Sequence, residues 1–341
     1  MKRKDFLKST AIASSGLFLS AQKSNATISK TLQKSIIPPY LKAGDLIGIT
    51  SPAGYITRED ILPACKMIYE WGYNIRSGYT IGKRDFTFGG TDEERLQDFQ
   101  SMLDDPSIKA IMCARGGYGA VRIVDKIDWT KFKKNPKWII GFSDITVLHS
   151  HIHQNLGIAT IHSKMCNSFP SDWALASDIQ KNTILSINNS LKGFKNEYKA
   201  EVNSANRLGK AKGVLVGGNL KTIETLSASK SDINTDGKIL LVEDTGEYMY
   251  SIDRMFWNLK RSGKLEQLSG LVIGGFKVKP DDPSDYFGKT LEEVVMEKLK
   301  EYSYPVCFNF PVGHQIDNYA VKLGVEHEID VQAHQVSLKE I

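Results

Sequence analysis

The sequence is poor in the residues that build disulfide-rich or metal-dependent proteins. Its 341 residues include four cysteines and no Cys-x-x-Cys pair, which is too few for a disulfide framework. His149, His151 and His153 alternate along an expected helix. Positions two apart do not share a helix face, so these histidines make a poor metal site. We therefore expect neither a metal nor a cofactor.

The chain also lacks an excess of charge once its first residues are set aside. The chain has 44 basic and 39 acidic residues. Residues 1–30 contain six of the basic residues and one of the acidic residues, so the rest of the chain has 38 basic and 38 acidic residues. A body so close to neutral does not favour binding to nucleic acid. The apolar stretch near the N-terminus is too short for a stable membrane anchor.

Residues 1–30 are typical of an export signal. Lys2, Arg3 and Lys4 form a positive segment, residues 9–21 are mildly apolar, and small residues that suit a cleavage site follow. The first eight residues also resemble a twin-arginine signal that has one arginine of the pair. We expect the protein to be exported to the periplasm, with a frayed cytoplasmic N-terminus as the alternative.

Residues 38–166 alternate short apolar strands with helices of amphipathic pattern. Strands are expected at 45–52, 74–81, 110–114, 138–140 and 158–161, and helices after Thr57, after a capping box at Thr91 and at 120–125. This alternation predicts an α/β domain with a parallel sheet that helices cover on both faces. Functional loops are then expected at the carboxyl ends of the strands.

The rest of the chain predicts a linker and a second domain. Residues 167–205 are polar, which predicts an inter-domain linker with one helix at 172–187. Residues 206–333 are richer in glycine and β-structure, which favours a smaller β-rich domain, a mixed barrel or a sandwich. Strands are expected at 238–243, 270–274, 306–310, 321–324 and 336–338, and helices at 219–227, 251–261 and 290–302.

Ser143 occupies the most informative position of the chain. The apolar strand ends at Gly141, and apolar residues at helical spacing begin at Ile145. A serine on so sharp a turn is raised from the sheet edge, and the amides of the following helix favour developing negative charge. This is the geometry of a nucleophile elbow, although Ile145 replaces the second glycine of Gly-x-Ser-x-Gly. The alternative is that Ser143 caps the helix.

A glycine-rich segment follows the strand at 110–114. Arg115-Gly116-Gly117-Tyr118-Gly119 would let backbone amides approach a ligand closely. Such amides can form an oxyanion hole, where one donor contributes about 3–4 kcal/mol to the transition state. A phosphate loop is weakly supported, because neither Lys-Ser/Thr nor the Gly-x-Gly-x-x-Gly spacing is present. An ordinary tight turn stays open as an alternative.

Two further strand ends carry residues suited to acid–base chemistry. Glu243 and Asp244 end an apolar strand, where a carboxylate can orient a histidine, and Glu247 competes for the same role. His314 follows another apolar run, in a turn marked by Pro311 and Gly313, and suits a general base. The alternatives are an acidic strand end that merely enters solvent and a surface histidine without a role.

Together these segments resemble the LD-carboxypeptidase family, the muramoyltetrapeptide carboxypeptidases. The matching segments occur in order between residues 38 and 330: Gly44-Asp45 with Ser51-Pro52-Ala53-Gly54, Phe88 to Leu96, Arg115 to Gly119, Gly141 to Thr146, Gly217-Gly218-Asn219-Leu220, Val242-Glu243-Asp244 and Gly313-His314. One departure bears on the substrate: the family often has His-Gly-Pro where this chain has His162-Ser163-Lys164.

The resemblance implies a serine peptidase with a Rossmann-like N-terminal domain and a smaller, barrel-like C-terminal domain. Ser143 would be the nucleophile, His314 the general base and Glu243 its orienting carboxylate. The implied reaction removes the terminal D-alanine from a peptidoglycan tetrapeptide. Members are commonly homodimers, so a homodimer is expected here too.

The resemblance also implies the groups around the triad. The amide of Asp144, with an amide of Gly116 or Gly117, would form the oxyanion hole, and Arg115 would meet a substrate carboxylate. A second hypothesis is that the protein is a self-immunity hydrolase of peptidyl-nucleotide antibiotics, in which an aromatic residue such as Trp173 would stack on adenine. A third is a non-catalytic muropeptide-binding protein, which predicts a broken triad.

Overall fold

The structure, a computed structural model, describes residues 35–341. The expected export signal at residues 1–30 lies outside these residues. Within the described part, no helix is long and apolar enough to cross a membrane. The four cysteines, which all fall in this part, are free thiols.

The first half of the chain builds a six-stranded sheet with the order β11-β5-β4-β3-β1-β2. Five of its strands are parallel, as the alternation of strands and helices predicted. The sixth strand comes from the C-terminal part and pairs antiparallel with β5. The strands are β1 (Leu46–Thr50), β2 (Asn74–Ser77), β3 (Ile108–Cys113), β4 (Trp138–Gly141), β5 (Thr160–His162) and β11 (Val321–Leu323).

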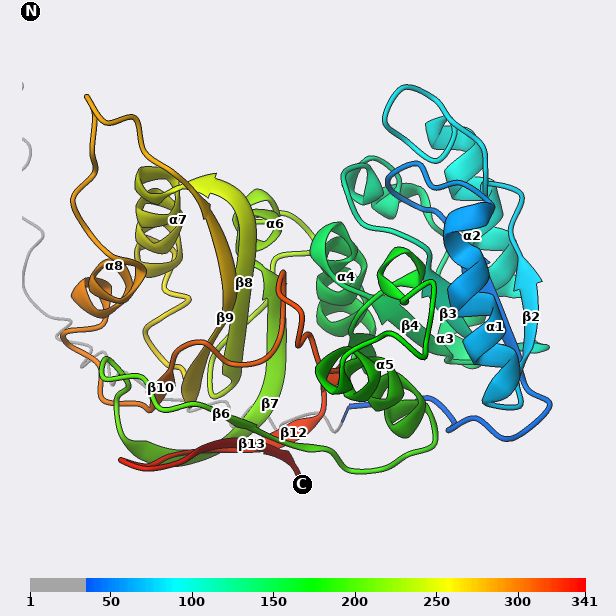
Figure 1. Ribbon diagram of the computed structural model, residues 1–341. Coiled ribbons are helices and arrows are strands. Elements are labelled where there is room, and N and C mark those ends of the chain that lie inside the picture. Colours follow the sequence, from blue (N-terminus) through cyan, green and yellow to red (C-terminus); the bar gives the residue numbers. More distant parts are fainter. Residues whose placement is uncertain (1–34) are drawn as a thin grey trace, which may run out of the picture. The chain divides into compact units, whose positions relative to one another are not determined.

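Helices cover both faces of this sheet (Figure 1). One face carries α1 (Leu62–Glu70) and α5 (Asp178–Leu191), and the other carries α2 (Asp92–Asp104), α3 (Thr130–Lys134) and α4 (Thr146–Leu156). Successive strand residues point to opposite faces, so Ile139 joins one cluster of buried side chains and Ile140 the other. The predicted Rossmann-like domain is therefore confirmed.

The second half forms a seven-stranded sheet with the order β10-β9-β8-β7-β12-β13-β6. Strands β7 to β10 are parallel, whereas β12, β13 and β6 pair antiparallel. A bridge between Arg207 and Val306 joins β10 to the chain just before β7, so the sheet curls. The strands are β6 (Glu197–Ala200), β7 (Gly209–Asn219), β8 (Ile239–Tyr248), β9 (Gly270–Lys279), β10 (Val306–Cys307), β12 (Glu326–Val331) and β13 (Val336–Glu340).

Three helices cover one face of this second sheet: α6 (Leu220–Thr225), α7 (Met249–Arg261) and α8 (Leu291–Lys298). The other face is enclosed by β12, β13 and the chain around β11, which share a second cluster of buried side chains. The expected β-rich C-terminal domain is confirmed. The shorter 3₁₀ turns are Glu59–Ile61, Ala120–Arg122, Val124–Lys126, Ser143–Ile145 and Cys166–Ser168.

Some elements differ from the sequence-based expectation. The helix expected at 172–187 is α5 at 178–191, because Ser177 and Gln180 form a capping box at its start. The helix expected at 120–125 is wrong: two 3₁₀ turns occupy that segment. Strand β6 falls within the range expected to be a linker.

The two halves meet where α4 packs against α6 and β7. The amide of Asn219, at the end of β7, donates a hydrogen bond of 2.9 Å to the hydroxyl of Thr146, at the start of α4. A Cβ on Gly218 would lie 2.4 Å from that hydroxyl, so glycine is needed for this approach. The contact brings the turn before α4 against the second half of the chain.

Candidate active site

Ser143 stands on a strained turn between β4 and α4. Its φ is +62°, a left-handed conformation that a residue with a side chain rarely adopts and that costs about 1–2 kcal/mol. Its side chain caps neither the 3₁₀ turn nor α4. The predicted sharp turn is confirmed, and the capping alternative is wrong. Strain of this kind is typical of functional positions.

The glycine-rich loop lies directly against Ser143. A Cβ on Gly116 would sit 3.0 Å from the Cβ of Ser143 and 3.2 Å from its hydroxyl oxygen. Among residues 35–341, the amides of Gly116 and Gly117 have no hydrogen-bond acceptor. Two free donors are thus available next to the serine, as an oxyanion hole requires.

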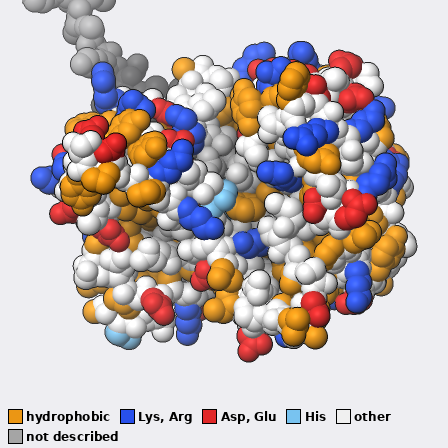
Figure 2. All heavy atoms as spheres, turned by 45° about the horizontal axis from the view of Figure 1, so that its top comes forward, with side chains coloured by type: hydrophobic (Ala, Val, Ile, Leu, Met, Phe, Trp, Pro, Cys, Tyr) orange, Lys and Arg blue, Asp and Glu red, His pale blue; other side chains and the backbone are white. Residues whose placement is uncertain are grey.

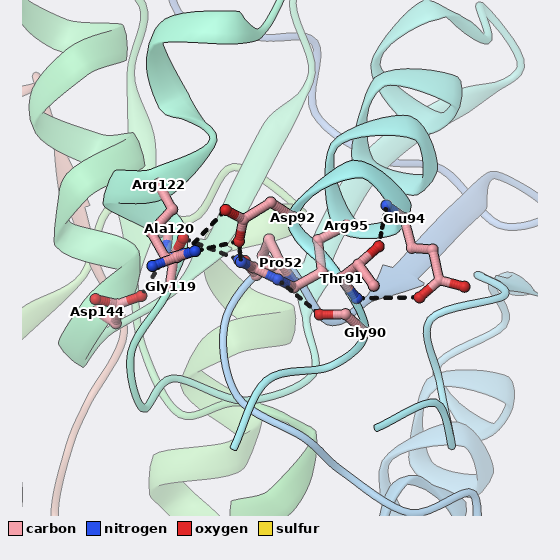
Figure 3. A network of polar contacts seen from close by, with 10 residues as sticks. All are labelled: Pro52, Gly90, Thr91, Asp92, Glu94, Arg95, Gly119, Ala120, Arg122 and Asp144. Carbon is pink, nitrogen blue, oxygen red and sulfur yellow. Dashed lines mark hydrogen bonds and ion pairs between the residues drawn. The ribbon is translucent and has the colours of Figure 1, made fainter. Parts of the chain in front are cut away.

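The buried side chain of Arg95 is hydrogen-bonded to the glycine-rich loop at Gly119 (Figure 3). The guanidinium of Arg95 is fully buried and donates to the carbonyl oxygens of Pro52 at 2.6 Å and Gly119 at 2.9 Å. It also donates to the carbonyl of Gly90 at 3.3 Å and forms an ion pair with Asp92. Arg95 therefore ties the loop after β3 to the loop after β1 and to the start of α2.

Asp144 supports the same loop from its other side (Figure 3). Its carboxylate accepts a hydrogen bond of 2.8 Å from the amide of Ala120. Burial raises the pKa of this carboxyl to about 6, although the amide of Ala120 and the charge of Arg95 act in the opposite direction. The side chain that follows the serine thus fixes the glycine-rich loop that lies against the serine.

Glu243 and His314 are brought together although 71 residues separate them. Glu243 is completely buried, and its Oε2 accepts a hydrogen bond of 2.5 Å from Nδ1 of His314. Gly313 has φ +100°, and a Cβ there would lie 2.5 Å from the Cβ of Glu243, so glycine lets the histidine loop rest on β8. The ring of His314 contacts the ring of Phe142 at 4.8 Å between centroids. A carboxylate-oriented histidine therefore lies beside the residue that precedes Ser143.

The competing acidic residues have other partners. Glu247 accepts a hydrogen bond of 2.7 Å from the hydroxyl of Ser251. Asp244 accepts one of 2.8 Å from the amide of Lys221, and burial raises the pKa of its carboxyl to about 7. Of the three acidic residues that the sequence left open at this strand end, Glu243 is the one that contacts the histidine.

A cavity of about 320 Å³ opens in front of Ser143. Its lining comes from both halves of the chain: Gly117, Tyr118, Val121, Ser143, Asp144, Val147, Asn219, Lys221, Thr222, Thr225, Asp244, Thr245 and Glu247. Figure 2 shows a hollow between the two halves, with a histidine and several basic side chains in it. The hydroxyl of Ser143 has no hydrogen-bond partner within the described chain.

Arg115 lies apart from this cavity. Its guanidinium donates a hydrogen bond of 2.8 Å to the carbonyl of Tyr55, and it is not among the lining residues. His149 has a structural place instead: its Nε2 lies 2.9 Å from the carbonyl oxygen of Gly141, and burial lowers the pKa of its ring to about 4. The neutral ring supports the end of β4 just before Ser143. No group of three metal-ligating side chains occurs in residues 35–341.

Both halves of the chain match known protein domains. Residues 47–163 match the model of the LD-carboxypeptidase N-terminal domain, and residues 212–329 match that of the C-terminal domain. The chain is 33% identical over 295 residues to a probable murein peptide carboxypeptidase of Bacillus subtilis, with 85% of this chain and 90% of the relative covered.

Two further relatives cover most of the chain. The microcin C7 self-immunity protein of Escherichia coli is 27% identical over 331 residues, with 88% of this chain and 94% of that protein covered. The crystal structure of a muramoyltetrapeptide carboxypeptidase from Oxalobacter formigenes superposes with a TM-score of 0.77 at 26% identity, over 86% of this chain and 98% of that one. The chain belongs to the LD-carboxypeptidase family of peptidases.

Proposed function

We propose that the protein is a serine-type LD-carboxypeptidase that releases the terminal D-alanine from peptidoglycan tetrapeptides. The observation that carries this proposal is the Glu243–His314 pair, which lies beside the strained turn that presents Ser143. A serine, a histidine and a buried carboxylate that orients the histidine are the parts of a catalytic triad.

The first half-reaction follows from these contacts. The hydroxyl oxygen of Ser143 attacks the carbonyl carbon of the terminal peptide bond, and Nε2 of His314 takes the hydroxyl proton. Glu243 accepts the hydrogen bond from Nδ1, which leaves Nε2 as the base and stabilises the imidazolium. The negative oxygen of the tetrahedral intermediate is met by the amides of Gly116 or Gly117 and of Asp144.

The second half-reaction regenerates the enzyme. The tetrahedral intermediate collapses, the peptide C–N bond breaks, and His314 returns its proton to the leaving amine of D-alanine. A water molecule then attacks the acyl-serine ester while His314 takes a proton from the water, the ester C–O bond breaks, and His314 returns the proton to the oxygen of Ser143. The products are D-alanine and the tripeptide with a new free carboxylate.

The substrate class rests on the family and on its named members. The relatives include a probable murein peptide carboxypeptidase and a muramoyltetrapeptide carboxypeptidase. We therefore propose a muropeptide as the substrate. Export to the periplasm and assembly into a homodimer stay predictions, which cell fractionation and light scattering of the purified protein would test.

The self-immunity protein supports a second candidate, the hydrolysis of a peptidyl-nucleotide. That activity was expected to need an aromatic side chain free to stack on adenine. Trp173 is half-buried and packs against the core of the first domain. The structure thus gives this tryptophan another role, and we place the peptidyl-nucleotide second.

A substrate panel tests the proposal. The purified protein is incubated with disaccharide-tetrapeptide, the corresponding pentapeptide and an aspartyl-nucleotide amide, and the products are analysed by mass spectrometry. We expect loss of one alanine from the tetrapeptide and no cleavage of the other two. Cleavage of the nucleotide alone would establish the second candidate, and binding without any cleavage would establish a muropeptide-binding protein.

A further inference from the structure

A second cavity, of about 260 Å³, lies against the residues that follow His314. It is bounded by the loop after β5, by α5, by β9 and by the residues that follow His314. Its lining consists of Lys164, Ser168, Gln180, Thr183, Ile184, Lys277, Gln315 and Ile316. Two lysines thus face one small cavity whose lining contains no carboxylate.

Lys164 connects this cavity to the catalytic histidine. Its Nζ donates a hydrogen bond of 2.5 Å to the carbonyl oxygen of Gln315, the residue after His314. The same Nζ lies 5.9 Å from the centroid of the Phe142 ring, and that ring contacts His314. One ammonium proton is used by the carbonyl, so two others stay available to a ligand.

The electrostatic environment of Lys164 is unfavourable without a ligand. Burial, together with the charge of Lys277, lowers the pKa of its ammonium to about 8, although Asp317 and Glu243 act in the opposite direction. Lys277 forms no ion pair and no hydrogen bond with any of residues 35–341. An anion in this cavity would relieve the repulsion between the two lysines and satisfy their free protons.

We propose that Lys164 and Lys277 bind the free carboxylate of the terminal D-residue that the reaction releases. This inference rests on the proposed function. His314 must reach the nitrogen of the leaving group, and in a terminal amino acid one carbon separates that nitrogen from the carboxylate. A cationic cavity beside His314 is therefore placed to select peptides that end there.

The inference explains two features that the reaction steps leave unused. Lys164 places a half-buried cation in the loop after β5, next to the residue that follows His314. Because Arg115 bonds to Tyr55 outside the first cavity, the substrate carboxylate needs another partner. Binding of the terminal carboxylate by the two lysines would restrict cleavage to the last residue of a peptide, as in an exopeptidase.

The test compares a tetrapeptide that ends in a free acid with the same tetrapeptide ending in a carboxamide. We expect the unmodified enzyme to prefer the acid by about 10- to 100-fold in kcat/KM, the range for loss of a charged hydrogen bond. Lys164→Met and Lys277→Met each reduce that preference, and the double variant brings it to within about threefold. The effect should fall mainly on KM.

Lys279→Met is the matched control. Lys279 is exposed on the same strand as Lys277 but lies 5.1 Å from the Tyr248 ring and does not line the cavity. Its substitution should keep the full preference for the acid. The inference is wrong if the double variant retains the preference, or if turnover of both peptides falls by the same factor. If Lys164→Met does not fold, Lys277→Met tests the inference alone, because Lys277 is exposed and its substitution should still reduce the preference for the acid.

A binding measurement separates this inference from the proposed function. Calorimetry with the Ser143→Ala variant measures the affinity for both peptides, with and without the two lysine substitutions. Tighter binding of the acid that disappears with the lysines supports the site even if the enzyme cleaves neither peptide. Equal affinity for acid and carboxamide would overturn it, whatever the activity.

Discussion

Replacing Arg95 by methionine would separate the support of the catalytic loop from the chemistry. The guanidinium is fully buried and donates to three carbonyl oxygens, of Pro52, Gly119 and Gly90, besides its ion pair with Asp92. Methionine keeps much of the volume but leaves buried acceptors without donors, at about 1–3 kcal/mol each. Because methionine adds apolar burial and avoids burying a charge, we expect a net loss of about 3–5 kcal/mol in the free energy of unfolding.

Thermal unfolding and steady-state kinetics measure the two consequences. At about 2–4 °C per kcal/mol for a domain of this size, Tm should fall by about 6–20 °C. The loop amides next to Ser143 lose their anchor, so kcat should fall by about 100- to 1,000-fold, as when one oxyanion donor is lost.

Arg122→Met is the control for this prediction. Arg122 bonds to the same Asp92 but is exposed, and an exposed ion pair contributes at most about 1 kcal/mol. Its substitution should change Tm by a few degrees at most. An Arg95→Met variant with the Tm and kcat of the unmodified enzyme would refute the idea that this arginine holds the loop.

Three further perturbations test other contacts. Glu243→Gln should lower kcat by about 1,000- to 10,000-fold with little change in KM, because the orienting carboxylate of His314 is lost; a change confined to KM would contradict this role. Gly116→Ala should lower kcat by about tenfold or more while Tm stays within about 2 °C, since its methyl group crowds Ser143 and its φ is not left-handed; an unchanged kcat would show that the loop does not confine the serine. The pKa of Asp244 is about 7 in the folded protein against an ordinary 3.8, so the folded state holds an extra proton between about pH 4 and 7. The free energy of unfolding therefore falls by about 2–4 kcal/mol as pH rises through that window. Asp244→Asn should flatten the fall in Tm between pH 5 and pH 8, and an equal fall in both proteins would contradict the assignment.

The turn at Ser143 could be predicted from the sequence because the pattern that determines it lies within a few neighbouring residues. The apolar run of β4 stops at Gly141, and the helical spacing begins four residues later. A change of period over so few residues requires a sharp turn. The positive φ of Ser143 then follows from the short distance between strand and helix.

Other features depend on contacts that sequence spacing does not reveal. Glu243 and Glu247 are equivalent as acidic residues near a strand end, and the loop of Gly313 distinguishes them only when it folds onto β8. The sequence pattern places Arg95 on the polar side of a surface helix, yet the side chain is buried and donates to the carbonyl of Pro52, 43 residues earlier in the chain. Strand β12 pairs with β7, more than a hundred residues earlier in the chain, which is a non-local contact.

The role of Ser143 as the nucleophile is tested by comparing the release of D-alanine from disaccharide-tetrapeptide by the unmodified protein and by the Ser143→Ala variant. We predict that the unmodified protein releases one D-alanine per peptide and that the variant is slower by about 10,000-fold or more, with the same Tm within about 3 °C. Release of D-alanine by Ser143→Ala at the rate of the unmodified protein would contradict the assignment of the nucleophile and the mechanism built on it.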